Sequence, residues 1–279
     1  MTNTHRFYAA FLVALVALAA PLMVGADEAT EVKAAEIGDV LPDFEGTDYD
    51  GNTWKFSKQD VKKADIETFV RKAAAEYGFK ADAPWTTQID SLDGVKEEGE
   101  VDDWMRREMI ASLGAPFGRL TSEESVKSLK TMGDIVTWIE KLNGKPTVFI
   151  CWGPRCPTSQ RLNEPMHETL AALDARVIAL GSNYNDKDED YDIYIENNDF
   201  WARIVPDREQ KITAVLGGKK TPHFMVVDTA RKLRYRGGLD SACSGVTTDE
   251  ADKKDWIADA VKAIIAGKDV PEGETKAVG

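Results

Sequence analysis

The feature that most constrains the fold of this chain is an apolar run that ends in a proline-marked turn around one cysteine. Residues 146–151 read PTVFIC, a run of the length and composition of a buried strand, and WGPRCPTSQR follows directly at residues 152–161. Pro157 suits the first position of a helix, because its fixed φ is helical and its missing N–H would have no partner there. The string therefore predicts a strand, a sharp turn, Cys156 as the N-cap, and a helix.

This placement makes Cys156 the leading candidate for a reactive residue. A thiolate at a helix N-terminus faces free backbone N–H groups and the positive end of the helix dipole, which lowers the pKa of the thiol. Arg155 and Arg161 lie close by in the sequence and add positive charge. The alternative is a buried, inert cysteine that closes the strand. The proline, the turn and the flanking arginines favour the reactive cysteine.

The N-terminal residues 1–26 have the pattern of a signal peptide. A weakly basic start precedes residues 7–26, which carry no charge, are interrupted by Pro21 and end in the small residues VGA. Cleavage is predicted after Ala26, which leaves residues 27–279 as one enlarged domain. An uncleaved membrane anchor is the alternative, since the uncharged run is just long enough to span a bilayer. Both interpretations predict export.

Composition limits the classes of function. The chain has 35 basic and 48 acidic residues, a net charge of −13, so nucleic acid is not an expected partner. Three cysteines in an exported protein leave one unpaired after any single internal disulfide, which indicates chemistry more than scaffolding. The alternating aspartates of residues 186–192 resemble a calcium loop, but Tyr191 and Asn197 replace the required Gly and Glu, so we expect a solvated loop and no metal. No cofactor is predicted.

The apolar pattern predicts an α/β fold. Residues 36–57 predict an opening β-hairpin, and residues 58–131 change to helical spacing, with a polar loop over 80–100. Beyond them, strands are predicted at residues 147–152, 176–180, 223–228 and 232–236, and helices at 134–142, 157–173, 193–201, 210–216 and 256–266. Such alternation indicates a central mixed sheet flanked by helices, with residues 58–131 as a helical insertion.

Three short motifs carry a resemblance to a known family. They are IGDVLPDF at residues 37–44, CPTSQR at residues 156–161 and KTP at residues 220–222. In this order and at these distances, they resemble the thioredoxin-like redoxins, specifically the exported bacterial branch related to the AhpC/TSA and TlpA/ResA-like proteins. The resemblance covers residues 37–57 and 144–276 and leaves out the helical insertion between them.

The resemblance implies a thioredoxin-like fold and a redox-active cysteine. Cys156 would be the nucleophile that attacks a disulfide or a peroxide. Ser159 stands where thioredoxin-type enzymes carry their second cysteine, and with Arg161 it would stabilise the Cys156 thiolate. Its place in the first helical turn is equally compatible with a simple cap of a free N–H. Cys243, which the thioredoxin topology brings to the same end of the sheet, or an external thiol would then complete the cycle.

The same resemblance implies where a substrate binds. Pro222 would be a cis-proline against Cys156, and Thr221, Trp152 and Pro157 would shape the groove beside it. The expected substrate is a protein disulfide or a small peroxide, with an external thiol as reductant. The helical insertion could bind a partner protein.

Two alternative functions follow from the same residues. Cys151, Cys156 and His223 resemble the two cysteines and distant histidine of Sco-type copper-delivery proteins, and thiolate and imidazole ligands suit Cu(I). The replacement of a second cysteine by Ser159 is instead compatible with a non-catalytic scaffold that keeps the thioredoxin-like fold and binds a partner through its inserted helices.

Overall fold

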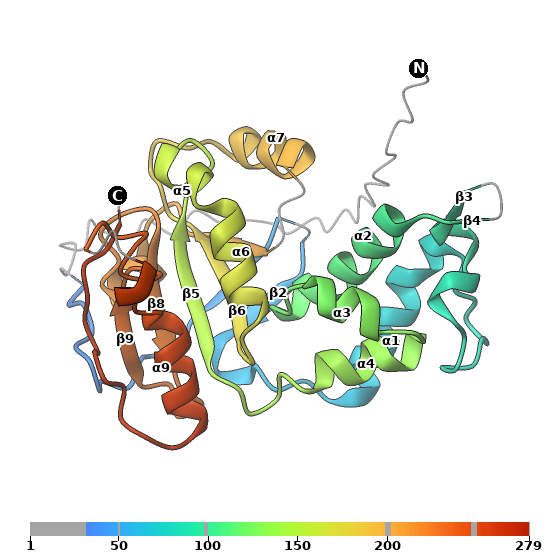
Figure 1. Ribbon diagram of the computed structural model, residues 1–279, viewed down its shortest axis with the longest axis horizontal. Coiled ribbons are helices and arrows are strands. Elements are labelled where there is room, and N and C mark those ends of the chain that lie inside the picture. The colour runs from blue at the N-terminus through green and yellow to red at the C-terminus, as the bar shows by residue number, and fades with distance from the viewer. Residues whose placement is uncertain (1–31, 50, 98–99, 199–201, 247–249, 279) are drawn as a thin grey trace, which may run out of the picture. The chain divides into compact units, whose positions relative to one another are not determined.

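A five-stranded mixed sheet forms the centre of the computed structural model (Figure 1). The structure describes residues 32–49, 51–97, 100–198, 202–246 and 250–278. The strands are β5 (Thr147–Trp152), β6 (Arg176–Gly181), β7 (Arg203–Pro206), β8 (His223–Val227) and β9 (Leu233–Gly237), in the spatial order β7-β6-β5-β8-β9. β5, β6 and β7 are parallel, while β8 and β9 are antiparallel to their neighbours. This arrangement confirms the predicted α/β fold.

β5 belongs to both hydrophobic layers, because successive side chains of a strand point to opposite faces. Val148, Ile150 and Trp152 belong to the core shared with α6 (Asn163–Ala171) and α9 (Trp256–Ile265), two helices that lie along the sheet in Figure 1. Phe149 and Cys151 belong to the other core, which includes α8 (Lys211–Leu216). The strand is therefore apolar at every position and buried throughout.

The predicted N-terminal hairpin is present. β1 (Glu45–Thr47) and β2 (Thr53–Lys55) pair antiparallel, and they pack against the sheet through aromatic side chains. Phe44 stacks on Phe56, with ring centroids 4.5 Å apart, and Phe149 of β5 meets Phe56 edge-on at 5.6 Å. The hairpin thus closes the second hydrophobic layer of the sheet.

The segment between the hairpin and β5 contains four helices around a core of their own. They are α1 (Lys63–Ala73), α2 (Asp103–Gly114), α3 (Glu123–Ser128) and α4 (Met132–Glu140). Capping boxes at Ser122 and Thr131 fix the starts of α3 and α4. The stretch predicted as a loop also holds two short 3-10 helices and a small hairpin, β3 (Lys96–Glu97) with β4 (Glu100–Val101).

Three elements differ from the sequence prediction. β7 was not predicted, and α7 (Asp188–Asn198) begins five residues earlier than expected. The single helix predicted over residues 157–173 is two helices, α5 (Pro157–Arg161) and α6, with a break at Leu162. Pro165 explains the break, because it has no N–H for the carbonyl of Arg161 and its ring would collide with that carbonyl in a continuous helix.

The predicted signal peptide lies outside the described residues. Within the part of the chain that the structure describes, no helix has both the length and the apolar character needed to span a bilayer.

Candidate active site

Cys156 occupies the position that its sequence context predicts. It is the N-cap of α5, with extended backbone angles, and Pro157 takes the first helical position. The turn before it is closed by a hydrogen bond from the Cys156 N–H to the Gly153 carbonyl at 3.1 Å. α5 and α7 both lie beyond the end of β5 where this turn is found (Figure 1). The fold thus holds Cys156 at the carboxyl end of the central strand.

The start of β8 supplies the opposite wall of the site. β8 runs antiparallel to β5, so it begins at the end of the sheet where β5 finishes. The Thr221–Pro222 peptide bond, just before β8, is cis, and the Thr221 carbonyl lies 3.0 Å from the Cys156 Sγ atom. Pro222 is buried and Thr221 is half-buried. The structure therefore brings together Cys156, Thr221 and Pro222, which lie far apart in the sequence.

The surroundings of Cys156 favour its thiolate. Burial opposes ionisation of this half-buried sulfur, but hydrogen bonds from the Thr221 side chain, from the backbone and side chain of Ser159, and from the Thr158 backbone outweigh it and lower the pKa of Cys156. These donors belong to the first turn of α5 and to the cis-proline loop. The Thr221 carbonyl, by contrast, accepts a hydrogen bond from the protonated thiol only.

Ser159 lies in the interior of this first turn. Its side chain is fully buried, and its hydroxyl has no hydrogen-bond partner within the described structure. A thiolate on Cys156 gives the hydroxyl an acceptor, which is the hydrogen bond that helps to lower the pKa of the thiol. Burying an unpaired hydroxyl costs free energy. Ser159 is therefore better satisfied when Cys156 is ionised.

Burial and hydrogen bonds are the main causes acting on the pKa of Cys156, so the two arginines contribute less to it than the sequence suggests. Arg155 is exposed and its guanidinium lies 3.7 Å from the carboxylate of Asp190 on α7. Arg161 is also exposed, and its charge acts on Cys243.

Cys243 lies in the turn region that follows β9. All three cysteines of the chain are free thiols in the structure. Burial and the nearby Asp240 carboxylate raise the pKa of Cys243 to about 11, and the positive charges of Lys253 and Arg161 counteract this only in part. Cys156 and Cys243 thus differ in character: the pKa of the first thiol is lowered and that of the second is raised.

Trp152 and Pro157 differ in their access to a substrate. Trp152 is completely buried, and its ring meets the rings of Tyr191 and Tyr194 edge-on. It supports the turn from inside the core and presents no surface. Pro157, by contrast, is exposed beside Cys156.

Cys151 is part of the hydrophobic core. Burial raises the pKa of its thiol to about 12, and Thr213 is its neighbour at 3.8 Å between Sγ and Oγ1. His223 is its cross-strand partner on β8, and burial together with nearby positive charges lowers the pKa of that imidazole to about 4. The Nδ1 atom of His223 accepts a hydrogen bond from the Lys219 N–H at 3.2 Å.

A metal centre built on Cys151, Cys156 and His223 would need the three side chains to lie together. The described residues contain no group of three or more histidine, cysteine or acidic side chains that could hold a metal ion. A thiol that strongly retains its proton is also a poor ligand, since metals bind the thiolate.

Asp186 is a notable residue that the sequence reasoning missed, because it lies in the stretch expected to be a solvated loop. The structure corrects that expectation for Asp186, whose exposed fraction is 5%. Its Oδ1 atom has no hydrogen-bond partner among the described residues, and a Cβ atom on Gly153 would lie 2.6 Å from Oδ2. Burial and the charge of Asp190 raise the pKa of this carboxyl. The glycine that opens the cysteine turn thus leaves room for a buried acid.

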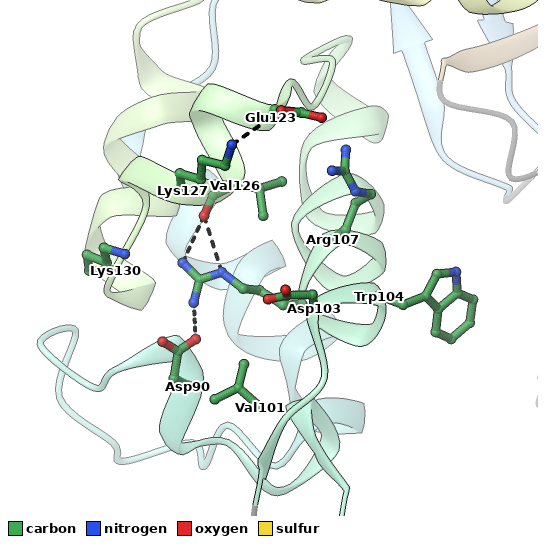
Figure 2. Close-up of a pocket in the computed structure, with 10 residues that line it drawn as sticks. Asp90, Val101, Asp103, Trp104, Arg107, Glu123, Val126, Lys127 and Lys130 are labelled. Carbon is green, nitrogen blue, oxygen red and sulfur yellow. Dashed lines mark hydrogen bonds and ion pairs between the residues drawn. The ribbon is translucent and has the colours of Figure 1, made fainter.

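A surface pocket of about 590 Å³ lies elsewhere, within the helical segment (Figure 2). Two ion pairs lie among its lining residues: Arg106 pairs with Asp90, and the Lys127 ammonium lies 3.3 Å from the Glu123 carboxylate. Trp104, an exposed residue of α2, points away from the latter pair in Figure 2. The pocket holds no reactive side chain comparable to Cys156.

The architecture around Cys156 defines a fold class. The order and direction of the five strands, the cysteine at the start of the helix after β5, and the cis-proline before β8 make this a thioredoxin-like fold, as the sequence resemblance implies.

Comparison with known proteins gives only distant matches. No protein-family model and no curated protein matches the sequence. Among solved structures, a hypothetical protein from Sinorhizobium meliloti is 15% identical, with a TM-score of 0.46 and coverage of 88% of this chain and 91% of its own. An uncharacterized conserved protein from Geobacillus kaustophilus is also 15% identical, with a TM-score of 0.46 and coverage of 86% and 87%. The thioredoxin domain of a thiol-disulfide oxidoreductase from Bacteroides vulgatus is 12% identical, with a TM-score of 0.36 and coverage of 72% and 86%.

Proposed function

We propose that this protein is an exported thiol oxidoreductase that uses Cys156 as its nucleophile. The observation that carries the proposal is the hydrogen-bonded environment of the Cys156 sulfur, at the N-cap of α5 and against the Thr221 carbonyl. A lowered thiol pKa provides thiolate at neutral pH, and the thiolate is the species that attacks disulfides and peroxides. The half-buried sulfur lies beside the exposed Pro157, so a substrate can reach it.

With a disulfide substrate, the Cys156 thiolate attacks one sulfur atom of the substrate. A new S–S bond forms between Cys156 and that sulfur, and the substrate's own S–S bond breaks. The other substrate sulfur leaves with the electron pair and takes a proton from water. A second thiolate, from Cys243 or an external thiol, then attacks the Cys156 sulfur of the mixed disulfide. The remaining substrate sulfur leaves as a thiol, and a disulfide forms between Cys156 and the attacking sulfur, which a further external thiol reduces.

With a peroxide substrate, the same thiolate attacks one oxygen atom. An S–O bond forms, the O–O bond breaks, and the leaving hydroxide or alkoxide takes a proton. The product on the protein is Cys156 sulfenic acid, which condenses with a second thiol to give a disulfide and water. An external thiol reductant then returns Cys156 to the free thiol, either from the sulfenic acid or from the disulfide.

Alkylation of each cysteine as a function of pH, followed by mass spectrometry, tests this proposal. We expect Cys156 to react with an apparent pKa clearly below about 8.5, the ordinary value for cysteine, and Cys151 to stay protected in the folded protein. Disulfide-exchange activity should disappear in Cys156→Ser and persist in the control Cys151→Ala. Full activity in Cys156→Ser would contradict the proposal, and an inert Cys156 would favour the scaffold alternative.

The resolving thiol is tested in the same preparation. After mild peroxide treatment, disulfide mapping should find Cys156 joined to Cys243 if the cycle is internal. If Cys156 is instead found joined only to added thiol, the reductant is external. Cys243→Ser distinguishes the two routes, because it blocks only the internal one.

A further inference from the structure

The turn that carries Cys243 is built around one buried carboxylate. Asp240, three residues before the cysteine, is only 3% exposed. Its Oδ1 atom accepts a hydrogen bond from the Cys243 N–H at 2.5 Å, and its Oδ2 atom lies 3.5 Å from the Lys253 ammonium. The Asp240 carbonyl also accepts a hydrogen bond from the Ser244 N–H at 3.3 Å. Asp240 therefore holds the backbone on both sides of the Cys243 side chain, and its own charge lies in an ion pair.

The same carboxylate acts on the Cys243 thiol. Burial opposes ionisation of this half-buried sulfur, the negative charge of Asp240 opposes it further, and a hydrogen bond from the thiol to the carboxylate holds the proton. The charges that act in the opposite direction are those of Lys253 and Arg161. Lys253 lies 3.5 Å from Asp240 and 3.5 Å from Asp255, so part of its charge is already neutralised. The surroundings of Cys243 therefore favour its protonated form.

The two candidate redox thiols thus have hydrogen-bonding neighbours of opposite kinds. The Cys156 sulfur has backbone and side-chain donors from the first turn of α5, and donors stabilise a thiolate. The Cys243 sulfur has a carboxylate, and a carboxylate accepts a hydrogen bond only from the protonated thiol. Because the thiolate is the species that attacks a disulfide, the arrangement around Cys243 works against attack by its sulfur.

We propose that Asp240 suppresses the internal disulfide by holding Cys243 as a thiol, so that an external thiol returns Cys156 to its reduced form. This inference rests on the proposed thiol oxidoreductase function and adds the regulation of its second step. Asp240 acts only through Cys243, which makes it a positioning residue. The opposite role, a base that takes the Cys243 proton during attack, suits this carboxylate less, because the Cys243 N–H and the Lys253 ammonium both stabilise its ionised form.

The test follows two successive releases of thionitrobenzoate. Reduced full-length protein is mixed with one equivalent of the symmetrical disulfide of thionitrobenzoate, and attack by the Cys156 thiolate releases the first thionitrobenzoate and leaves the second bonded to Cys156. If Cys243 then attacks the Cys156 sulfur, a Cys156–Cys243 bond forms and the bond to thionitrobenzoate breaks. The second thionitrobenzoate leaves with the electron pair, and the Cys243 proton goes to water. The first release therefore measures Cys156 and the second measures Cys243, with Cys243→Ser as the blank for the second.

In the unmodified protein, the second release should be slow at neutral pH and should still be rising at about pH 9, about 10-fold for each pH unit, as the thiolate fraction grows. In Asp240→Asn the rise should level off at a lower pH, and the release at neutral pH should be on the order of 10-fold faster. The matched control is Asp255→Asn. It removes an exposed carboxylate from the same Lys253 without removing a hydrogen bond from Cys243, so it should leave the second release unchanged.

The outcomes separate this inference from the function on which it rests. A second release in Asp240→Asn that is absent or unchanged would overturn the role of Asp240 and leave the oxidoreductase function intact. A slower second release would also overturn it and would assign Asp240 the role of a base. Absence of the first release would overturn the function itself. If Asp240→Asn does not fold, the pH profile of the unmodified protein decides: a second release that is fast at neutral pH, or that levels off below about pH 9, contradicts the inference.

Discussion

At the scale of single residues, one buried hydroxyl is among the groups that act on Cys156. Ser159 stands at the position of the second cysteine of a Cys-x-x-Cys motif, and its fully buried hydroxyl has no hydrogen-bond partner among the described residues. The Ser159 side chain is one of the hydrogen-bonding groups that lower the pKa of Cys156. We therefore propose that Ser159 contributes to the reactivity of the remaining cysteine.

Ser159→Ala is expected to raise the pKa of Cys156. A hydrogen bond to a charged group contributes about 1.5–3 kcal/mol, so the thiolate fraction at neutral pH should fall about 10-fold or more. The pH profile of Cys156 alkylation measures the effect. Thr158→Ala is the control, because it keeps the backbone N–H that faces the sulfur. An unchanged profile in Ser159→Ala would mean that the backbone donors suffice.

Asp186→Asn is expected to stabilise the protein at neutral pH. Because burial and Asp190 raise the pKa of Asp186, the folded protein binds this proton more tightly than the unfolded chain does. This tighter proton binding stabilises the folded protein fully at pH values below about 3.9, the pKa of an aspartate in the unfolded chain. The stabilisation is lost as the pH rises through the higher pKa of Asp186 in the folded protein. Asparagine removes the buried charge, so the gain should be present at neutral pH and absent in acid.

Denaturant unfolding at about pH 3.5 and about pH 7 measures this gain. Asp188→Asn is a control of opposite sign, since its hydrogen bond with Arg208 lowers the pKa of that carboxyl. It should lose stability at neutral pH and recover in acid. A gain in Asp186→Asn that is equal at both pH values would show that charge is not its cause.

At the scale of elements, the aromatic contacts between the hairpin and the sheet can be tested. Phe56 is 2% exposed and packs against Phe44 and Phe149. Phe56→Ala should cost about 3–5 kcal/mol of unfolding free energy, the usual range for a buried phenylalanine. The exposed Trp104 is the comparison, because Trp104→Ala should stay within about 0.5 kcal/mol. A loss of unfolding free energy in Phe56→Ala as small as that in Trp104→Ala would show that the hairpin contributes little to the core.

The elements also show where sequence reasoning succeeds and where it fails. β5 and the start of α5 were predictable, because an apolar run, a turn and Pro157 leave little choice. β7 was missed because it is only four residues long, begins with Arg203 and ends in a proline. Its arginine is buried and pairs with the buried Asp48, a contact between distant segments that no local pattern predicts.

In the candidate site, too, local features were predictable from the sequence and contacts between distant segments were not. Cys156, Ser159 and Pro157 are local in sequence, and the structure places them as the motif predicts. Asp186 was overlooked because it packs beside Gly153, which comes from a distant part of the sequence, as well as beside Tyr191, five residues further along the chain. Aspartates in an acidic stretch are usually solvated, and only the tertiary packing distinguishes this one.

At the scale of the whole molecule, export is the property that the sequence predicts and that an intact mass can test. Cleavage after Ala26 would give a secreted chain that begins at Asp27. Mass spectrometry of the protein recovered from the exported fraction should find this N-terminus. Recovery of the full-length chain in the membrane fraction would support the uncleaved anchor instead.

The contrast between Cys156 and Cys243 has a practical consequence for finding substrates. A captured substrate is released only when a second thiolate attacks, and a thiol with a pKa of about 11 supplies very little thiolate at neutral pH. Without added thiol, the covalent complex between the protein and its client should therefore be long-lived. The unmodified protein would act as its own affinity reagent, and its clients should be visible as larger species on a non-reducing gel.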